Sequence, residues 1–307
     1  MKGITIMNRK EFLRSGALIT GGILLQGHKY FLRDNEQPAG FKVIRDNFGI
    51  FNERGGTMGW YASKGAVVVI DSQFPESAKN FYNGLKTKTD RKIDFLINTH
   101  HHRDHTSGNY FLKDFTNKIV SSEKTKELQK KFNGSDPNNP QAYADITFDK
   151  EWTIDIGSEK INTMQICSAH TAGDIIIHFE KTNVAHMGDL VFNKVYPVID
   201  LPGGSDLKGW IDYLEKAVKL FDADTIFIFG HAQTTEGVVG SSTDLLAMRD
   251  YISALMEFVT NEIKSGKTKD EIVSAQTIPY VTSVKEMWAG AMKRNIEAAY
   301  DYLSTGK

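Results

Sequence analysis

The chain has 307 residues, which is enough for one large domain or two ordinary ones. Its 40% hydrophobic and 24% charged residues are typical of a globular protein and exclude long disorder, a collagen and a coiled-coil rod. The formal net charge of -1 gives no basic field for nucleic acid, so no nucleic-acid partner is expected. The single cysteine, Cys167, excludes an internal disulfide framework and a zinc site built from several cysteines.

Residues 1–27 are predicted to be an export signal, and residues 28–40 a linker. A basic segment at positions 8–14 precedes the apolar run 15–25, which is too short to span a bilayer comfortably. The segment resembles a twin-arginine signal in which Lys10 replaces the second arginine, so a periplasmic or otherwise exported protein is expected. If it is instead an uncleaved apolar arm, the protein is cytoplasmic. No later run reaches transmembrane length, so no stable membrane span is expected.

Apolar patterning predicts a series of strands and helices between residues 41 and 240. The expected strands are 41–44, 49–52, 58–63, 66–70, 94–98, 145–156, 160–167, 174–180, 183–187 and 225–229, and the expected helices are 75–86, 122–132 and 207–220. The run 66–70 is continuously apolar, as in a strand with both faces covered. Two groups of strands with helices outside each predict two sheets packed face to face and covered by helices.

The chain is expected to be helical throughout after about residue 240. Between Val284 and Leu303, apolar side chains recur at three- and four-residue spacing, which predicts a stripe facing the core: Met287, Trp288, Met292, Ile296 and Tyr300. Residues 241–307 should therefore form a helical extension packed on a domain of residues 41–240.

A histidine cluster directly follows the predicted strand 94–98. Residues 99–108 read Thr-His-His-His-Arg-Asp-His-Thr-Ser-Gly, and imidazoles with a carboxylate at this spacing suit zinc. Alternate residues of an extended segment point the same way, so His100 and His102 can bind one ion. Where the chain turns, Asp104 and His105 can bind a second. His101 points to the other side, either behind the ligands or toward solvent.

Three shorter motifs also follow predicted strands. They centre on His170 in the segment 168–174, on Asp189 after Met187-Gly188, and on His231 after Gly230. Glycine beside a ligand permits a close approach of the backbone or an unusual φ angle. Each motif alone is weak, but in this order behind the histidine cluster they predict one metal centre.

Taken together, these motifs, which span residues 99–231, resemble those of the metallo-β-lactamase superfamily. The pattern of strands and helices over about residues 41–240 resembles the fold of the same superfamily. The resemblance implies an α/β fold, a four-layer αββα sandwich with a C-terminal helical extension. It assigns the first metal to His100, His102 and His170, and the second to Asp104, His105 and His231, with Asp189 bridging both. The implied cofactors are two zinc ions per chain, with iron or manganese possible.

The resemblance also implies a reaction. A hydroxide bridging two metal ions would attack an ester, thioester, lactone or amide-type bond of a small molecule, with Asp104 as the catalytic residue that orients it. Asp71, at the end of the strand 66–70, is expected to give structural support. Thr99 and Thr171 are expected to contact the ligands, and Asp174 to cap a turn or begin a strand. His28, His178 and His186 have ordinary structural interpretations, although His186 lies near Asp189 in sequence.

Other activities stay open. One lactamase subclass has a cysteine ligand at the position of Asp189, and this chain does not match it. Another subclass has the pair found here as Asp104 and His105, but it usually lacks an acidic residue at the position of Asp189. The pattern favours the branch resembling glyoxalase II and lactonases, with β-lactamase as an alternative. A mononuclear iron sulfur dioxygenase or a non-catalytic metal-binding protein are further alternatives, whereas a nuclease would need an extra domain or a basic exosite. The oligomeric state cannot be read from the pattern.

Two regions are predicted to shape specificity. The glycine-rich connection 53–60 offers Met58 and Trp60 as an apolar flap, although Trp60 could equally belong to the core. The segment 193–205 should overhang the metals and carries Lys194 and Tyr196. Lys194 could hold a substrate carboxylate, or it could be an ordinary solvated lysine.

Overall fold

The computed structural model describes residues 37–134 and 136–305. The predicted export signal, residues 1–27, and most of the predicted linker lie outside the described residues. From Gln37 onward the chain forms one compact unit. Among the described helices, none is both long and apolar enough to cross a bilayer.

The first sheet has seven strands, which lie in sequence order. They are β1 Phe41–Arg45, β2 Phe48–Phe51, β3 Met58–Ala62, β4 Val67–Ile70, β5 Ile93–Ile97, β6 Thr116–Ser122 and β7 Ile146–Phe148. Strands β1 to β4 pair antiparallel, and β4 to β7 pair parallel. The carboxyl ends of β4 and β5 therefore meet at one edge of the sheet, where a ligand site can be built from the loops that follow them.

The second sheet has six strands in the order β15-β13-β11-β10-β9-β8. They are β15 Val239–Gly240, β13 Ile226–Ile228, β11 Val184–His186, β10 Ile176–Phe179, β9 Lys160–Met164 and β8 Glu151–Asp155. A separate parallel pair joins β12 Phe192–Asn193 to β14 His231–Ala232, with Phe192 opposite His231. This pair fixes the start of β14 next to the turn after β11.

The predicted strand 145–156 is wrong in one respect, because it is two strands in two different sheets. β7 pairs with β6 of the first sheet, whereas β8 pairs with β9 of the second. The chain bends at Asp149 and Lys150 and crosses between the sheets there. Strand propensity on both sides of such a bend is continuous, so the pattern alone does not reveal the crossing.

The described helices are α1 Pro75–Leu85, α2 Arg103–Thr106, α3 Asn109–Leu112, α4 Glu123–Asn133, α5 Leu207–Leu220, α6 Ser242–Lys264, α7 Lys269–Val273 and α8 Ala291–Ser304, with 3₁₀ turns at Lys113–Phe115, Gly188–Leu190 and Glu236–Val238. Four of the helices, α4 to α7, begin at a residue whose side chain caps them. Pro75 is the first residue of α1. The side chains of Ser122 and Asp206 cap α4 and α5 by accepting backbone N–H groups. The predicted helices 75–86, 122–132 and 207–220 thus form at nearly the expected bounds.

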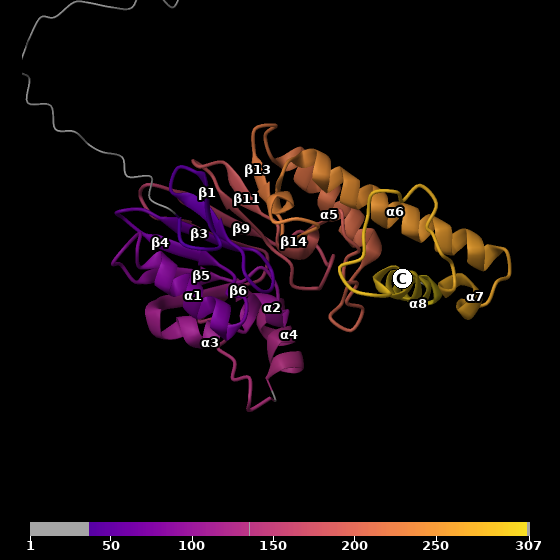
Figure 1. Ribbon diagram of the computed structural model, residues 1–307, viewed down its shortest axis with the longest axis horizontal. Coiled ribbons are helices and arrows are strands. Elements are labelled where there is room, and N and C mark those ends of the chain that lie inside the picture. The colour runs from indigo at the N-terminus through magenta and orange to yellow at the C-terminus, as the bar shows by residue number, and fades with distance from the viewer. Residues whose placement is uncertain (1–36, 135, 306–307) are drawn as a thin grey trace, which may run out of the picture. The chain divides into compact units, whose positions relative to one another are not determined.

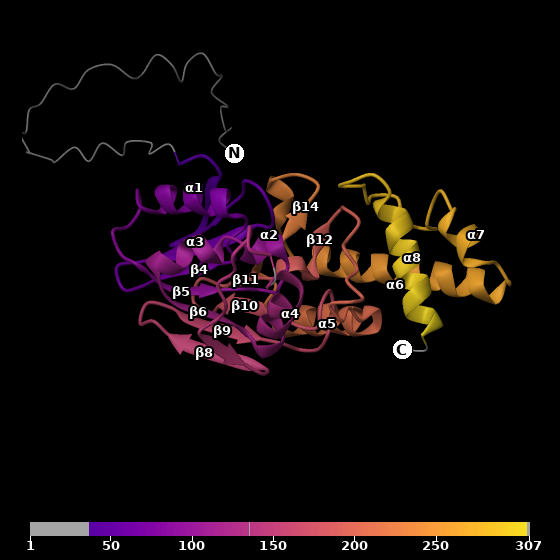
Figure 2. The same cartoon turned by 90° about the horizontal axis from the view of Figure 1, so that it is seen from below.

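The side chains of β4 show directly that the sheet is covered on both faces. Val67 and Val69 pack in the apolar layer under α1, whereas Val68 and Ile70 pack in the layer between the sheets. A third apolar layer lies between the second sheet and α5, α6 and α8. Figures 1 and 2 show α1 and α3 beside the first sheet and α5 beside the second. The predicted four-layer αββα fold is therefore confirmed.

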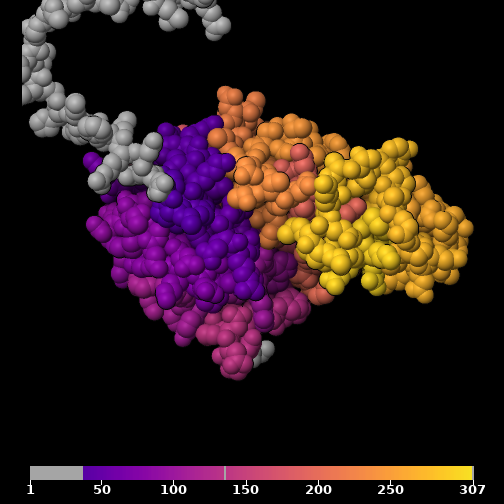
Figure 3. Space-filling model, in the orientation of Figure 1, coloured from indigo at the N-terminus to yellow at the C-terminus, as the bar shows by residue number. Residues whose placement is uncertain are grey.

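The C-terminal part is helical in α6, α7 and α8 but not throughout, because residues 275–290 are irregular. Here Lys285 donates its backbone N–H to Lys194 O and accepts that of Tyr196, so the segment bonds to another loop. Helix α8 begins only after Gly290, whose φ of 81° is left-handed. The predicted stripe from Val284 is thus wrong for its first turns, and Met287 is 43% exposed. Figure 3 shows this part of the chain lying against the preceding segments.

Candidate metal centre

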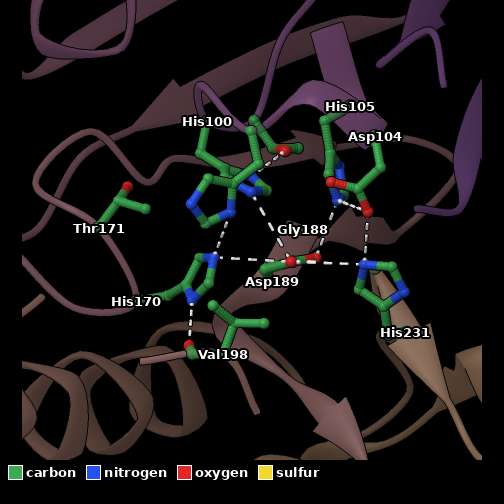
Figure 4. A network of polar contacts seen from close by, with 12 residues as sticks. His100, Asp104, His105, His170, Thr171, Gly188, Asp189, Val198 and His231 are labelled. Carbon is green, nitrogen blue, oxygen red and sulfur yellow. Dashed lines mark hydrogen bonds and ion pairs between the residues drawn. The ribbon is translucent and has the colours of Figure 1, made fainter. Parts of the chain in front are cut away.

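The structure brings together every residue that the sequence predicted as a metal ligand (Figure 4). The histidine cluster leaves the end of β5 and enters α2, while Asp189 lies in the 3₁₀ turn after β11. His231 opens β14, which pairs with β12. Loops from both sheets therefore meet at one edge of the sandwich. The predicted ligand atoms form two groups: His100, His102, His170 and Asp189 in the first, and Asp104, His105 and His231 in the second. A further possible group joins His101 and His102 to Asp200.

The first group is compact and largely buried, with the His102 side chain 21% exposed. His170 Nε2 lies 3.1 Å from His102 Nδ1, and the four candidate atoms lie within 4.8 Å of one another. Asp189 Oδ2 is 3.7 Å from His100 Nε2 and 3.6 Å from His170 Nε2. Three imidazole nitrogens and a carboxylate oxygen at these separations can surround one tetrahedral ion.

The second group shares Asp189 with the first. Asp189 Oδ1 lies 3.1 Å from His105 Nε2, and Asp189 Oδ2 lies 3.5 Å from His231 Nε2. Asp104 Oδ2 is 3.0 Å from His231 Nε2 and 3.6 Å from His105 Nε2. The Asp189 carboxylate thus faces both groups, which is the arrangement that a ligand bridging two ions requires.

The charges differ between the two groups. Burial lowers the pKa of His100 well below its usual value, and burial beside His102 lowers that of His170 to about 3, so both keep a free electron pair. Burial opposes charge on His231 too, but Asp189 and Asp104 outweigh it and raise the pKa of His231 to about 9. Burial would raise the pKa of Asp104, but His105 and His231 lower it to about 2. The carboxylates therefore favour positive charge in the second group, whether as protons or as a metal ion.

Several atoms that face the centre lack hydrogen bonds. Within the described residues, His100 Nε2, His105 Nε2 and Asp189 Oδ1 are buried and lie outside hydrogen-bond geometry, the last two although they approach each other to 3.1 Å. Leaving a buried polar atom unpaired costs about 1–3 kcal/mol. Three such atoms converging on one point fit the presence of a bound cation, and the imidazole and carboxylate donors suit zinc.

Asp71 supports both groups from behind. Its carboxylate accepts His105 Nδ1–H over 2.7 Å and also accepts the N–H and the hydroxyl of Thr99. The Thr99 hydroxyl oxygen lies 3.0 Å from His100 Nδ1 and accepts a hydrogen bond from its N–H, since the hydroxyl proton is donated to Asp71. Each histidine is thereby held with Nε2 facing the centre. Structural support is the role that the sequence predicted for Asp71, and contact with a ligand is the role that it predicted for Thr99.

On the other side of the centre, Asp174 accepts the backbone N–H and the hydroxyl of Thr171. It therefore caps the turn that follows His170, which is one of the two roles left open by the sequence. Burial raises the pKa of Asp174 to about 7 despite these bonds. His186 accepts the N–H of Gly188, the residue before Asp189.

The sequence did not single out Asp200, which lies against the cluster. Its Oδ2 is 2.9 Å from His102 Nε2 and 3.5 Å from His101 Nε2. His101 is 2% exposed, so it lies behind the ligands and does not face solvent. The only sequence signal for Asp200 is its place before Leu-Pro-Gly-Gly, within the segment already expected to overhang the metals.

Gly230 is required by the close approach of Asp189. A Cβ atom at this position would lie 1.9 Å from Asp189 Oδ1. Gly188 has a φ of 52°, and a Cβ there would lie 2.7 Å from Thr99 Cβ. These glycines have the role expected for the Gly-Asp and Gly-His motifs.

The predicted substrate contacts do not form as expected. Met58 and Trp60 are 0% and 4% exposed, and the Trp60 indole donates to Ile50 O, so both belong to the core under α1 and form no flap. Tyr196 is also buried, and its ring packs on Tyr251 at 5.7 Å. Lys194 is exposed beside α6 and lines a cavity that contains none of the candidate ligands. Met58 and Trp60 point inward because they lie on the face of β3 that packs in the layer under α1.

A different cavity opens beside the candidate metal centre. It has a volume of about 310 Å³ and includes His231 in its wall. Its lining is largely polar and comes from the segment after β2, the segment after β14 and the C-terminal extension: Asn52, Glu53, Gly55, Thr57, Gly230, His231, Ala232, Gln233, Thr234, Thr235, Val238 and Met287. The glycine-rich connection therefore does reach the site, but through Glu53, Gly55 and Thr57.

Comparison with known proteins agrees with this geometry. Residues 52–231, more than half of the chain, match the family model described as the metallo-beta-lactamase superfamily. The chain therefore belongs to the metallo-beta-lactamase superfamily. The metallo-beta-lactamase type 2 of Elizabethkingia meningoseptica is 26% identical over 170 residues, which cover 55% of this chain and 65% of that protein. The matched part thus spans less than two thirds of that relative.

Two further proteins are similar. A probable metallo-hydrolase from Methanocaldococcus jannaschii is 29% identical over 162 residues, covering 49% of this chain and 73% of that protein. The structure of a metallo-beta-lactamase from Pontibacter korlensis superposes with a TM-score of 0.61 at 18% identity, covering 69% of this chain and 98% of the other. The superposition confirms the predicted fold.

Proposed function

We propose that the protein is a dinuclear zinc-dependent hydrolase that cleaves an ester, thioester, lactone or amide-type bond of a small molecule. The observation that carries the proposal is the shared position of Asp189, whose two oxygens face two separate groups of histidines. His100, His102 and His170 would hold one ion, and Asp104, His105 and His231 the other. Bound zinc supplies Lewis acidity, which makes hydroxide available near neutral pH and stabilises negative charge on oxygen.

The chain's own groups would then place the attacking water. Asp104 is 28% exposed and therefore reaches the solvent side of the centre. Because the pKa of Asp104 is lowered to about 2, its carboxylate is charged at neutral pH and can orient the water by accepting a hydrogen bond from it. Asp189 is 3% exposed and lies beneath the other ligands, so it serves to hold the two groups together.

The cavity beside His231 is the proposed substrate site. Its walls offer hydroxyl and amide groups from Thr57, Gln233 and Thr234, and none of its lining residues is Lys or Arg. A larger cavity of about 420 Å³ beside Cys167 contains none of the candidate ligands, so we do not assign the substrate to it. Apart from the candidate metal centre at His231, the walls carry hydroxyl and amide groups and the carboxylate of Glu53, without a lysine or arginine. This lining favours an uncharged polar substrate over one whose carboxylate needs a Lys or Arg partner, as the alternative of a β-lactam does.

The test is a substrate panel assayed on purified protein of measured metal content. An activated ester, a thioester, a lactone and a cephalosporin are compared for the wild type, His102→Ala, Asp104→Asn and the control His178→Gln, a histidine outside the cluster. We expect both site variants to lose most of the hydrolysis and the control to retain it. Undiminished turnover in both site variants contradicts the proposed site. One iron per chain supports the dioxygenase alternative, and zinc binding without turnover supports a non-catalytic protein.

Export is a separate part of the proposal and is supported by the sequence of residues 1–27 alone. Cell fractionation of the full chain, compared with a Lys10→Arg variant that restores the second arginine, tests it. We expect the protein in the exported fraction in both cases, and cytoplasmic protein in both would contradict the prediction.

A further inference from the structure

The segment between β12 and α5 is folded around the first group of histidines. Asp200 closes a turn, since its Oδ1 accepts the N–H of Gly203 and its backbone oxygen accepts that of Ser205. The turn is tied to the chain on both sides of His170. Ala172 N–H donates to Gly203 O, and the Ser205 hydroxyl donates to Ala169 O. The turn and His170 are thus parts of one hydrogen-bonded unit.

This segment contacts two of the candidate ligands on the nitrogen that faces away from the centre. His170 Nδ1–H donates to Val198 O over 2.8 Å, and His102 Nε2–H donates to Asp200 Oδ2 over 2.9 Å. A neutral imidazole carries its proton on one nitrogen and a free electron pair on the other. Both contacts place the proton on the outer nitrogen, so the electron pairs of His170 Nε2 and His102 Nδ1 face each other across 3.1 Å.

We propose that Asp200 is a positioning residue, which fixes the tautomer and the ring orientation of His102 so that Nδ1 is presented to the metal. The inference rests on the proposed function, since it assumes that the first group binds zinc. A carboxylate behind a histidine ligand also makes the imidazole a stronger donor. His101, whose Nε2 lies 3.5 Å from the same carboxylate oxygen, packs beside it and limits its movement.

Asparagine cannot replace this carboxylate fully. Asp200 uses Oδ1 for Gly203 N–H and Oδ2 for His102, whereas an asparagine side chain has a single acceptor oxygen. Asp200→Asn therefore either loses the turn contact or sets an NH₂ group against His102. Gly203→Ala displaces the carboxylate without changing it chemically, because a Cβ there would lie 2.0 Å from Asp200 Oδ2. The two variants test the same contact by independent routes.

The experiment is a titration of the metal-free full chain with zinc alone against a competing chelator. We expect Asp200→Asn and Gly203→Ala each to weaken one of two zinc sites by about 10- to 100-fold. In a His102→Ala background, Asp200→Asn should have no further effect on zinc affinity, because the contact acts through His102. A general loss of stability would not give this dependence. Asp206→Asn is the matched control, because this carboxylate caps α5 and bonds Tyr302, and we expect its zinc affinity to equal that of the wild type.

The outcomes separate this inference from the proposed function. If the wild type binds no zinc, the proposed function fails. If the wild type binds two ions and both variants bind them as tightly, Asp200 has no positioning role. Three ions per wild-type chain, with the third lost in Asp200→Asn, would also overturn the inference, because Asp200 would then be a metal ligand itself together with His101 and His102.

Discussion

The carboxylate of Asp71 accepts the Nδ1–H of His105 over 2.7 Å, and both side chains are buried. The same carboxylate accepts a hydrogen bond from the hydroxyl of Thr99, and the Thr99 oxygen in turn accepts one from His100 Nδ1–H. Since His100 belongs to the first candidate group and His105 to the second, one aspartate orients a histidine in each. The two groups are therefore coupled through a residue that lies outside both.

Asp71→Asn should weaken zinc binding in both groups. The amide has one acceptor oxygen for contacts that now use both carboxylate oxygens, so His105 or Thr99 loses its partner. We expect zinc affinity to fall by about 10- to 100-fold, measured by chelator competition. The control is Asp94→Asn, because the Asp94 carboxylate accepts Val67 N–H away from the centre. Unchanged affinity in Asp71→Asn would show that Thr99 and the backbone hold the histidines without the carboxylate.

Gly230→Ala should disrupt the centre by steric overlap. The added methyl group would lie 1.9 Å from Asp189 Oδ1, so the carboxylate shared by the two groups must move. We expect hydrolysis to fall by more than about 100-fold, since a displacement of about 1 Å at a reacting site has effects of that size. The control Gly65→Ala meets nothing closer than 3.6 Å. Equal activity of the two variants would contradict the shared role of Asp189.

The candidate ligands could be predicted from the sequence because their signal is local. His100, His102, Asp104 and His105 are crowded into one loop, and His170, Asp189 and His231 each follow a predicted strand. Parallel strands bring their carboxyl ends to one edge of a sheet, so residues far apart in sequence could be placed together. The layers of the fold could also be predicted from the sequence, because Val67 to Ile70 form a continuous apolar strand that must be covered on both faces.

The remaining features depend on contacts that no local pattern records. Asp200 bonds His102 across 98 positions of sequence, and a lone aspartate before a turn looks the same whether or not it has such a partner. Met58 and Trp60, two residues apart, share one face of β3, but the sequence does not say whether that face meets solvent or α1. The break before α8 arises because Lys285 bonds the loop at Lys194 in place of its own helix.

Asn295→Ala should loosen the attachment of α8. The Asn295 amide donates to Pro197 O, and its oxygen accepts the hydroxyl of Tyr251 on α6, so it joins two helices to the loop before Asp200. Removal leaves buried polar groups unpaired, which should lower the free energy of unfolding by about 2 kcal/mol. Urea denaturation measures this change. The exposed Asn117→Ala is the control and should change stability by less than about 0.5 kcal/mol. An equally small effect in both would mean that α8 is held by its apolar contacts alone.

His178 should make the fold sensitive to acid. Burial lowers the pKa of His178 below its usual 6.5, and its ring packs on Phe221 in the outer layer of the second sheet. The unfolded chain therefore binds a proton more readily than the folded chain, so stability is complete above pH 6.5 and falls as the pH drops toward the folded-state pKa. One such group contributes at most about 1.4 kcal/mol per pH unit.

His178→Gln removes this titration while leaving the candidate metal centre intact. Stability is compared at about pH 7.5 and about pH 5.5, on either side of the ordinary histidine pKa of about 6.5. We expect the free energy of unfolding to fall less between these two values in the variant than in the wild type. Urea denaturation of both proteins in excess chelator measures it, because metal release at low pH would otherwise contribute. Identical losses would place the acid sensitivity at other groups, such as His186, whose pKa burial lowers to about 4. The direction of the effect follows from burial. Below about pH 6.5 the unfolded chain takes up a proton that the buried His178 does not, so a falling pH favours the unfolded state.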